Sequence, residues 1–208
     1  MKVFRRLTPS VKHPPCALTI GNFDGVHRGH QALLQQLVQG ARSRQLQSCV
    51  LTFEPHPREF FSPSDAPPRI QNIRDKLIAL KNHDIDQVVI AEFNQAFSQL
   101  SPDEFVKKVL IEGLNAKWLL IGDDFCYGAK RAGNFKSLVN AGKKFGFEVS
   151  SISTVLESNE RISSSLLRRA LEDGHMDQAS RLLGRPYSIS GHVLYGKQLG
   201  RELGFPTI

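Results

Sequence analysis

The sequence alternates short apolar runs with segments of helical periodicity over its first 185 residues. This alternation is typical of a parallel sheet with helices on both faces, because parallel strands must be joined by crossovers. The expected strands are residues 16–20, 48–53, 87–91, 118–121 and 148–152. The expected helices are residues 30–44, 72–82, 102–111, 135–145 and 164–173. We therefore predict an α/β fold built on a Rossmann-like parallel sheet.

The composition is ordinary for a soluble globular protein, with 40% hydrophobic and 23% charged residues in a chain of 208. No apolar run approaches the roughly 18 residues of a membrane-spanning helix, and the first six residues lack the apolar core of a signal peptide. We therefore expect a cytoplasmic protein that does not associate with membranes. Cys16 and Cys49 lie in apolar runs and are expected to be buried, inert thiols, and Cys126 is not expected to be a nucleophile.

The formal net charge of +7 favours anionic ligands. The basic residues are spread along the chain, without the aromatic-interleaved basic stripe that marks many nucleic-acid-binding proteins. Anionic small molecules therefore fit the charge better than nucleic acid does.

A glycine- and histidine-rich loop joins the first expected strand to the first expected helix. Gly21, Gly25 and Gly29 permit close backbone approach or positive φ, and His27 and His30 lie three residues apart. Free N–H groups and the helix dipole favour anions at such a junction, so the loop is suited to the phosphates of a nucleoside triphosphate. A metal pair or two solvated histidines are the alternatives. Because no metal-binding motif or carboxylate cluster accompanies the pair, we expect no metal site.

Three later segments also follow expected strands, where open α/β sheets bind ligands. In the first, residues 52–58, prolines flank His56 and stiffen a loop beside Phe53, which favours stacking of a planar ligand. Core aromatic residues at a rigid turn are the alternative. In the second, residues 121–128, Asp124 is an acceptor for ring N–H groups of a heterocycle, unless it only caps a turn. Arg131, just beyond, is suited to a phosphate.

The third segment, residues 161–169, opens a helix with three serines and continues to Arg168. Serine at an N-cap explains a structural helix start by itself. Three serines followed by an arginine exceed what a cap needs, and they predict a second anion site.

Four motifs together resemble one enzyme family, and they occur in the family's order. The motifs are Gly-x-Phe-Asp-Gly-x-His-x-Gly-His (21–30), Thr-Phe-Glu-Pro-His-Pro (52–57), Gly-Asp-Asp-Phe-x-Tyr-Gly (122–128) and Ile-Ser-Ser-Ser-x-x-Arg (162–168). Residues 1–185 resemble the adenylyltransferase domain of bacterial bifunctional riboflavin kinase/FMN adenylyltransferases, also called FAD synthetases. Residues 186–208 resemble the beginning of the kinase domain of that family.

The resemblance implies FAD biosynthesis: ATP and FMN, with Mg²⁺, give FAD and pyrophosphate on a nucleotidylyltransferase-type fold. The catalytic residues that it implies are His27, His30 and Arg168. The ATP-binding residues that it implies are Gly21, Phe23, Gly29, Ser164 and Ser165. The flavin-binding residues that it implies are Phe53, Pro55, His56, Pro57, Asp124, Tyr127 and Arg161. Related nucleotidylyltransferases with another phosphate acceptor, or a non-catalytic flavin- or nucleotide-binding module, remain alternatives.

The end of the chain is expected to contain the first strands of the β-barrel kinase domain. Residues 188–194 alternate like a strand, and residues 196–204 are rich in glycine. About twenty residues cannot bury a core of their own, so this segment should dock on the first domain or fray. Since most of the kinase domain is not in these residues, we do not expect this chain to phosphorylate riboflavin.

Overall fold

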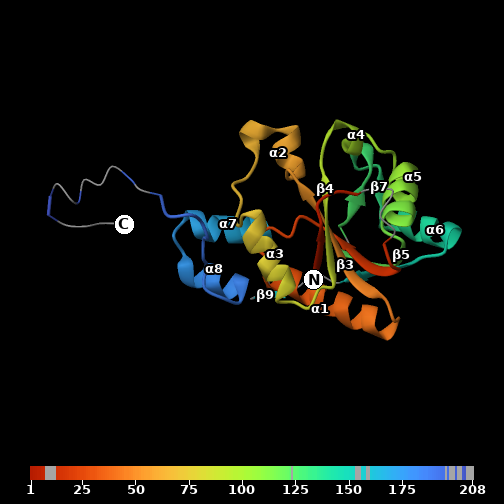
Figure 1. Cartoon of the computed structure of the whole chain (residues 1–208), viewed down its shortest axis with the longest axis horizontal. Coiled ribbons are helices and arrows are strands. Elements are labelled where there is room, and N and C mark those ends of the chain that lie inside the picture. The colour runs from red at the N-terminus through yellow and green to blue at the C-terminus, as the bar shows by residue number, and fades with distance from the viewer. Residues whose placement is uncertain are drawn as a thin grey trace.

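A six-stranded sheet forms the centre of the protein, and all its neighbouring strands run parallel in the order β1-β4-β3-β2-β5-β8 (Figure 1). Its strands are β1 (Lys2–Phe4), β2 (Cys16–Ile20), β3 (Gln47–Glu54), β4 (Gln87–Glu92), β5 (Ala116–Gly122) and β8 (Glu148–Ile152). The computed structural model describes residues 1–7, 13–122, 124–152, 156–157, 160–194, 196, 200 and 203–204.

Helices and two short antiparallel strand pairs surround the sheet. The α-helices are α1 (Arg28–Ser43), α2 (Pro57–Phe61), α3 (Ile73–Lys81), α4 (Gln95–Ser98), α5 (Pro102–Glu104), α6 (Phe135–Phe145), α7 (Ser164–Glu172) and α8 (Met176–Leu183). The other helical segments are the 3₁₀ turns η1 (Pro63–Asp65) and η3 (Ala129–Arg131) and the π-helix η2 (Phe105–Gly113). The short strands pair as β6 (Cys126–Tyr127) with β7 (Gly133–Asn134), and as β9 (Leu156–Glu157) with β10 (Glu160–Arg161).

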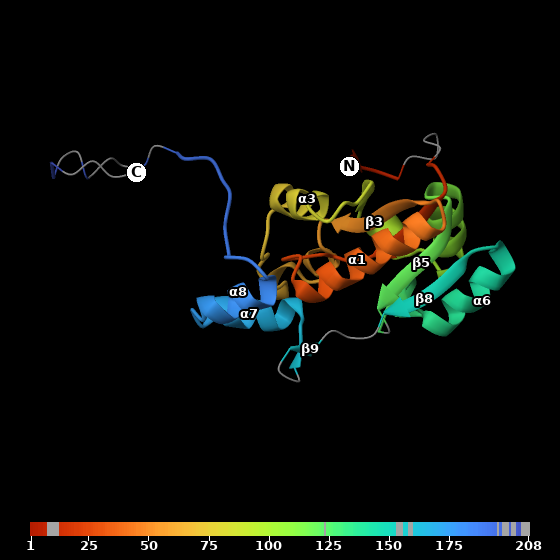
Figure 2. The same cartoon turned by 90° about the horizontal axis from the view of Figure 1, so that it is seen from below.

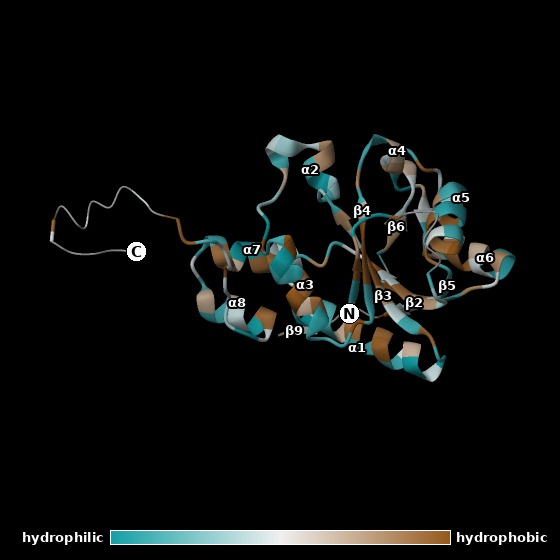
Figure 3. Ribbon diagram, in the orientation of Figure 1, coloured by the Kyte–Doolittle hydropathy of each residue, from teal (hydrophilic) through white to brown (hydrophobic). Residues whose placement is uncertain are grey.

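The four central strands of the sheet are largely buried on both faces, and hydrophobic residues occur both in the strands and in the helices around them (Figure 3). Successive strand residues point to opposite faces, so each strand contributes to two apolar clusters. On one face, Leu34 and Leu37 of α1 and Leu80 of α3 pack with strand residues such as Val50. On the other face, η2 and α6 cover residues such as Leu18. This is the predicted α/β arrangement.

A third apolar cluster joins α7 and α8, which lie side by side at one end of the molecule in both cartoon views (Figures 1 and 2). Leu167 of α7 and Leu182 of α8 are buried in it, together with Ile70 from the loop before α3. Helix α8 is absent from the sequence prediction. Its eight residues are too few for periodicity to be distinctive, and contacts with α7 stabilise it.

The strand order places a ligand-binding crevice. From β2 the chain adds β3 and β4 on one side, and it then returns to add β5 and β8 on the other side. A change of direction of this kind leaves a crevice beyond the carboxyl ends of the two strands where it occurs, here β2 and β5. The histidine loop follows β2, and the loop that contains Asp124 follows β5.

The five predicted strands are confirmed, with small differences at their ends. The predicted helix 102–111 begins at a capping box, in which Ser101 and Glu104 exchange hydrogen bonds, but it continues as a π-helix. The three-residue strand β1 was missed because it is short and pairs only with β4.

The predicted strand at 188–194 is not formed in the described structure. A strand needs a hydrogen-bonding partner, and the apolar side chains of Ile189, Val193 and Leu194 are 79–81% exposed. The segment is nevertheless tied to the first domain at Ser190. The Ser190 hydroxyl donates to the Asp75 carboxylate, and the Asn72 side-chain amide donates to the Ser190 carbonyl at 3.0 Å.

Candidate functional site

A cavity of about 280 Å³, which we call the histidine cavity, opens at the carboxyl ends of β2 and β5. Its lining combines the histidine loop, the loop after β5 and the start of α7. The lining residues are Ile20, Gly21, Phe23, His27, Gly29, His30, Leu33, Gly122, Asp124, Phe125, Ile152, Arg161, Ile162, Ser163 and Ser164. The N-terminal ends of α1 and α7 both border it. Because the first N–H groups of a helix lack partners within the helix and its dipole is positive there, two helix N-termini at one cavity favour an anion.

His27 and His30 lie against each other at the start of α1. The Nδ1 atom of His27 caps the helix by accepting the His30 backbone N–H at 3.3 Å. The two imidazole rings stack with centroids 3.7 Å apart, and the Phe23 ring lies 5.0 Å from that of His30. The Nδ1 atom of His30 is buried and has no partner among the described residues. The pair is fixed by the fold rather than free in solvent.

Burial keeps both imidazoles neutral. It lowers the pKa of His27 to about 4, against opposing effects that include the nearby Asp24 carboxylate. Burial, followed by the effects of His27 and Lys76, also lowers the pKa of His30 well below its ordinary value. A neutral imidazole still donates one hydrogen bond, and a phosphate nearby would favour its protonated form.

The loop that carries the histidines has an unusual backbone. Phe23 and Val26 have φ values of +49° and +41°, and Gly25 has a φ of +90°. Side chains rarely adopt this left-handed region, and for a β-branched residue such as Val26 it costs free energy. A Cβ atom on Gly29 would lie 3.2 Å from the His27 ring, so this glycine allows close contact, as the sequence predicts.

Asp24 holds the histidine loop in place through hydrogen bonds and an ion pair. Its buried carboxylate accepts the backbone N–H groups of Ile70 at 3.1 Å and Gln71 at 3.2 Å. It also forms an ion pair with Arg168, whose Nε donates to the Pro68 carbonyl at 2.8 Å. The Ser164 hydroxyl donates to the Asp24 carbonyl at 2.9 Å. Ser164 was predicted to bind ATP and Arg168 to act in catalysis, and here both hold the histidine loop in place.

The start of α7 distributes its serines unequally. Ser163 is the N-cap, and its hydroxyl accepts the Leu166 N–H. Ser163 and Ser164 line the cavity, whereas Ser165 is exposed and lies outside it. Arg161, expected on the flavin side, lines the histidine cavity and forms a 2.7 Å ion pair with Asp124.

A second cavity of about 780 Å³ adjoins the first, and the two share Ile20, Gly21, Asp124 and Phe125. Aromatic rings dominate its lining, which includes Phe53, Phe61, Phe93, Phe97, Phe105 and Tyr127. Arg58, Lys130 and Arg131 supply positive charge at its border. A wide aromatic space with a few charged groups is suited to a planar heterocycle.

An ion-pair cluster holds one wall of the aromatic cavity. Arg69 binds the Glu54 carboxylate with two hydrogen bonds, at 2.6 and 3.1 Å, and it also binds Glu59 of α2. His56 caps α2 through its Nδ1 atom, and its own N–H donates to Glu59 at 3.1 Å. The long loop of residues 54–69 is therefore ordered around α2. Pro57 starts this helix, and Pro55 follows a cis peptide bond.

All the sequence-predicted site residues except Pro55, Ser165 and Arg168 line one of the two cavities. Sequence reasoning missed Phe93 and Phe97. Phe93 directly follows β4, so its place after a strand end was a usable signal.

Burial raises the pKa of Tyr127, whose hydroxyl lies 3.1 Å from that of Ser137.

Sequence reasoning also missed Lys76 on α3. This lysine is 7% exposed, and within the described residues its ammonium has no hydrogen-bond or ion-pair partner. Burial lowers its pKa, against the opposing influence of Asp24 and Glu54. A lysine side chain this deeply buried favours an anion close to it. No periodicity in the sequence distinguishes it from an exposed helix lysine.

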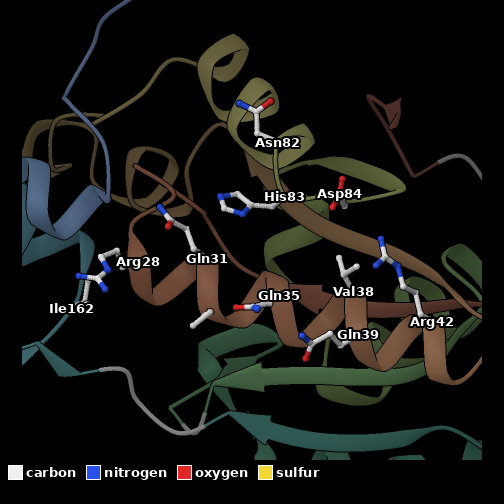
Figure 4. Close-up of a pocket in the computed structure, with 11 residues that line it drawn as sticks. Arg28, Gln31, Gln35, Val38, Gln39, Arg42, Asn82, His83, Asp84 and Ile162 are labelled. Carbon is white, nitrogen blue, oxygen red and sulfur yellow. The ribbon is translucent and has the colours of Figure 1, made fainter.

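A third cavity, of about 690 Å³, runs along the outer side of α1 (Figure 4). Polar side chains such as Gln35, Gln39 and Arg42 line it, with Asn82 and His83 opposite. None of the sequence-predicted site residues lies in its lining. The site chemistry is therefore concentrated in the other two cavities.

The remaining predictions concern thiols, metals and membranes. Cys16 and Cys49 are buried free cysteines, as predicted, and Cys126 is a partly exposed one. Among the described residues, no three histidine, cysteine, aspartate or glutamate side chains are grouped so as to hold a metal ion. The described helices include none with the length and apolar character needed to cross a bilayer.

Comparison with family models gives two matches. The model described as FAD synthetase matches residues 10–166, and the model described as riboflavin kinase matches residues 183–208. The second match accords with the prediction that a kinase domain begins near the end of this chain.

The curated relatives are named for two activities, riboflavin kinase and FMN adenylyltransferase. Bifunctional riboflavin kinase/FMN adenylyltransferases from Escherichia coli (strain K12) and Haemophilus influenzae are each 46% identical over 192 residues, which is 92% of this chain. The alignments cover 61% and 62% of these relatives, so the chain spans about three fifths of their length. A solved structure titled as a macrolide-efflux protein from Streptococcus pneumoniae matches with a TM-score of 0.84 and 28% identity. That match covers 99% of this chain and 67% of the other, and it confirms a shared fold.

Proposed function

This chain belongs to the FAD synthetase family, and we propose that it transfers an adenylyl group from ATP to FMN, giving FAD and pyrophosphate. One structural observation supports this reaction above others. A histidine cavity bordered by two helix N-termini directly adjoins an aromatic cavity, and the two share four lining residues. A nucleotide and a flavin bound in these cavities would meet at the shared wall.

In the proposed reaction, a phosphate oxygen of FMN attacks the α-phosphorus of ATP. A new P–O bond forms, the bond to the β-phosphate oxygen breaks, and pyrophosphate leaves with the electron pair. Negative charge accumulates on the phosphate oxygens, so positioning and hydrogen-bond donors supply most of the catalysis.

In this proposal, ATP binds in the histidine cavity. The imidazoles of His27 and His30 would donate hydrogen bonds to the triphosphate and stabilise the transition state, together with Ser164 and the helix N–H groups. Gly21, Phe23 and Gly29 would shape the nucleotide pocket. Lys76, whose side chain is largely buried, adds positive charge near His30 and supports an anionic ligand.

Arg168 and Ser165 have the least direct support as ligands. Arg168 is committed to Asp24 and Pro68, so we propose that it acts mainly by positioning the histidine loop. Ser165 is exposed, and its predicted contact with ATP requires a triphosphate that extends beyond the cavity.

The flavin side of the proposal uses the aromatic cavity. Phe53, His56, Pro57 and Tyr127 line it and would contact the isoalloxazine ring, with Pro55 shaping the loop. Asp124 stands at the shared wall with its partner Arg161, where an entering substrate would compete for either charge.

Three further expectations belong to the same proposal. Mg²⁺ would arrive with ATP, because this ion takes most of its ligands from substrate phosphates and water. The division into an adenylyltransferase domain (1–185) and the start of a kinase domain (186–208) is supported by the two family matches. A cytoplasmic location fits enzymes that use ATP and a flavin, with small molecules rather than nucleic acid or membrane as partners.

The central test is replacement of His30 by alanine. The substitution should lower FAD formation by at least about 100-fold, because it removes a donor aimed at the developing charge, and should leave the fold intact. Pyrophosphate release with ATP and FMN measures the rate, and circular dichroism measures folding. The matched control is His175→Ala, since His175 is exposed and its side chain caps nothing. A His30→Ala variant with wild-type turnover would refute the assignment.

The acceptor is tested in the same assay. Pyrophosphate release should depend on FMN and should not occur with a pantetheine phosphate or nicotinamide mononucleotide. Release with another acceptor would favour a related nucleotidylyltransferase. Binding of FMN and ATP without any release would favour a non-catalytic module.

A further inference from the structure

A guanidinium from the segment just after α8 reaches the loop that carries His27. Arg185 lies just after α8, outside the residues that the FAD synthetase model matches. Its Nη2 atom donates to the Gly25 carbonyl at 2.9 Å, and its Nη1 atom donates to the Val26 carbonyl at 3.3 Å. The Nη1 atom also donates to the Leu183 carbonyl at 3.2 Å.

Gln31 of α1 completes this network. Its side-chain amide donates to the Val26 carbonyl at 2.9 Å and to the Leu183 carbonyl at 2.7 Å. The carbonyls of Val26 and Leu183 are therefore each shared by Arg185 and Gln31. Figure 4 shows Gln31 near the beginning of α1, beside Arg28.

The loop needs such restraint because of its backbone. Gly25 and Val26 both have positive φ, and a β-branched residue persists there only where its surroundings hold it, at a cost of about 1–3 kcal/mol. Arg185 holds the carbonyls of these two residues. His27 follows directly, so the orientation of Val26 sets where its imidazole lies.

The same terminal segment also supports the other side of the loop. The Tyr187 hydroxyl donates to the Ile70 carbonyl at 3.2 Å, and the Ile70 N–H binds the Asp24 carboxylate. Arg185 is half-buried, and a guanidinium taken from water needs hydrogen-bond acceptors in return. Here the acceptors are three backbone carbonyls rather than a carboxylate.

We propose that Arg185 is a positioning residue for the adenylyl transfer: it fixes the carbonyls of Gly25 and Val26 and thereby the imidazole of His27. This inference rests on the proposed function. Arg185 touches no reacting atom, and its effect passes through the loop. A misplacement of about 1 Å in a catalytic group can cost about 100-fold in rate.

The test compares Arg185→Ala with Arg181→Ala, an exposed arginine on α8, in the full chain. The Arg185→Ala variant should lower the turnover number for FAD about 10- to 100-fold, and added guanidinium ion should restore part of the loss. Arg181→Ala should match the wild type. In ¹⁵N NMR titrations, the pKa of His27 should rise in Arg185→Ala from its value of about 4 toward its ordinary 6.5.

Two outcomes would overturn the proposal. One is a folded Arg185→Ala variant with wild-type turnover and an unchanged His27 titration; the other is a lower melting temperature with unchanged turnover of the folded fraction. If Arg185→Ala does not fold, Arg185→Lys keeps the charge and should show intermediate turnover, and wild-type turnover would refute the role. If the wild type makes no FAD, the proposed function fails, and the His27 titration still tests the positioning.

Discussion

His27 shows how one residue serves both the fold and the site. Its Nδ1 atom caps α1, its ring stacks on His30, and burial lowers its pKa to about 4. The spacing in the sequence predicted that this residue lies at a helix start near an anion site. The sequence could not predict that the imidazole is neutral, because burial depends on what α7 and the loop before α3 place around it.

The lowered pKa makes folding stability depend on pH. In the unfolded chain, His27 titrates near 6.5, and in the folded protein near 4, so between these values the unfolded state binds more protons. Stability should therefore be greatest above pH 6.5 and fall by up to about 3 kcal/mol as the pH decreases to 4. Urea unfolding of the wild type and of His27→Gln between pH 4 and 7 measures this. The variant should lose part of the slope, and equal slopes would show that His27 does not contribute.

At the scale of elements, α1 carries the histidines and must be seated firmly on the sheet. Gly40, in its last turn, faces Trp118 of β5, whose ring is fixed by a 3.0 Å hydrogen bond to Ser150 and by Arg44, which lies 4.3 Å from the ring centroid. A glycine inside a helix usually lowers stability relative to alanine. Here the close approach of helix and strand requires it.

Replacing Gly40 by alanine decides between these two effects. Helix propensity alone would stabilise the protein by about 1 kcal/mol. The added Cβ atom would lie 2.3 Å from the Trp118 ring, and such overpacking costs about 1–3 kcal/mol or more. We expect net destabilisation by roughly 1–2 kcal/mol in urea unfolding. The exposed neighbour Gln39→Ala should change stability by less than about 0.5 kcal/mol. A more stable Gly40→Ala variant would show that the interface relaxes.

At the scale of the whole molecule, two cavities of different character meet at the carboxyl edge of one sheet. The walls of the histidine cavity come from the loops after β2 and β5 and from α7. Those of the aromatic cavity come from β3, α2 and the segment after β4. The two proposed substrates, ATP and FMN, would therefore bind to largely different sets of residues.

Substitutions on the two sides should therefore act on different Michaelis constants. Phe93→Ala removes an aromatic wall and should raise the KM for FMN roughly tenfold, since about 1.4 kcal/mol of contact energy corresponds to that factor. Leu33→Ala, in the histidine cavity, should raise the KM for ATP and leave that for FMN nearly unchanged. Steady-state kinetics with each substrate varied measures both. Equal effects of each variant on both constants would contradict two separate subsites.

The sequence by itself determined the alternation of strands and helices, the four motifs and the side of the sheet where they gather. These depend on local periodicity and on strand ends, which neighbouring residues set. Tertiary structure decided that Arg168 serves Asp24, that Ser165 lies outside the cavity, and that Lys76 and Phe93 lie near the site. It also decided that Arg185 holds a loop 160 positions away. Such contacts arise when distant segments pack together, and no local pattern encodes them.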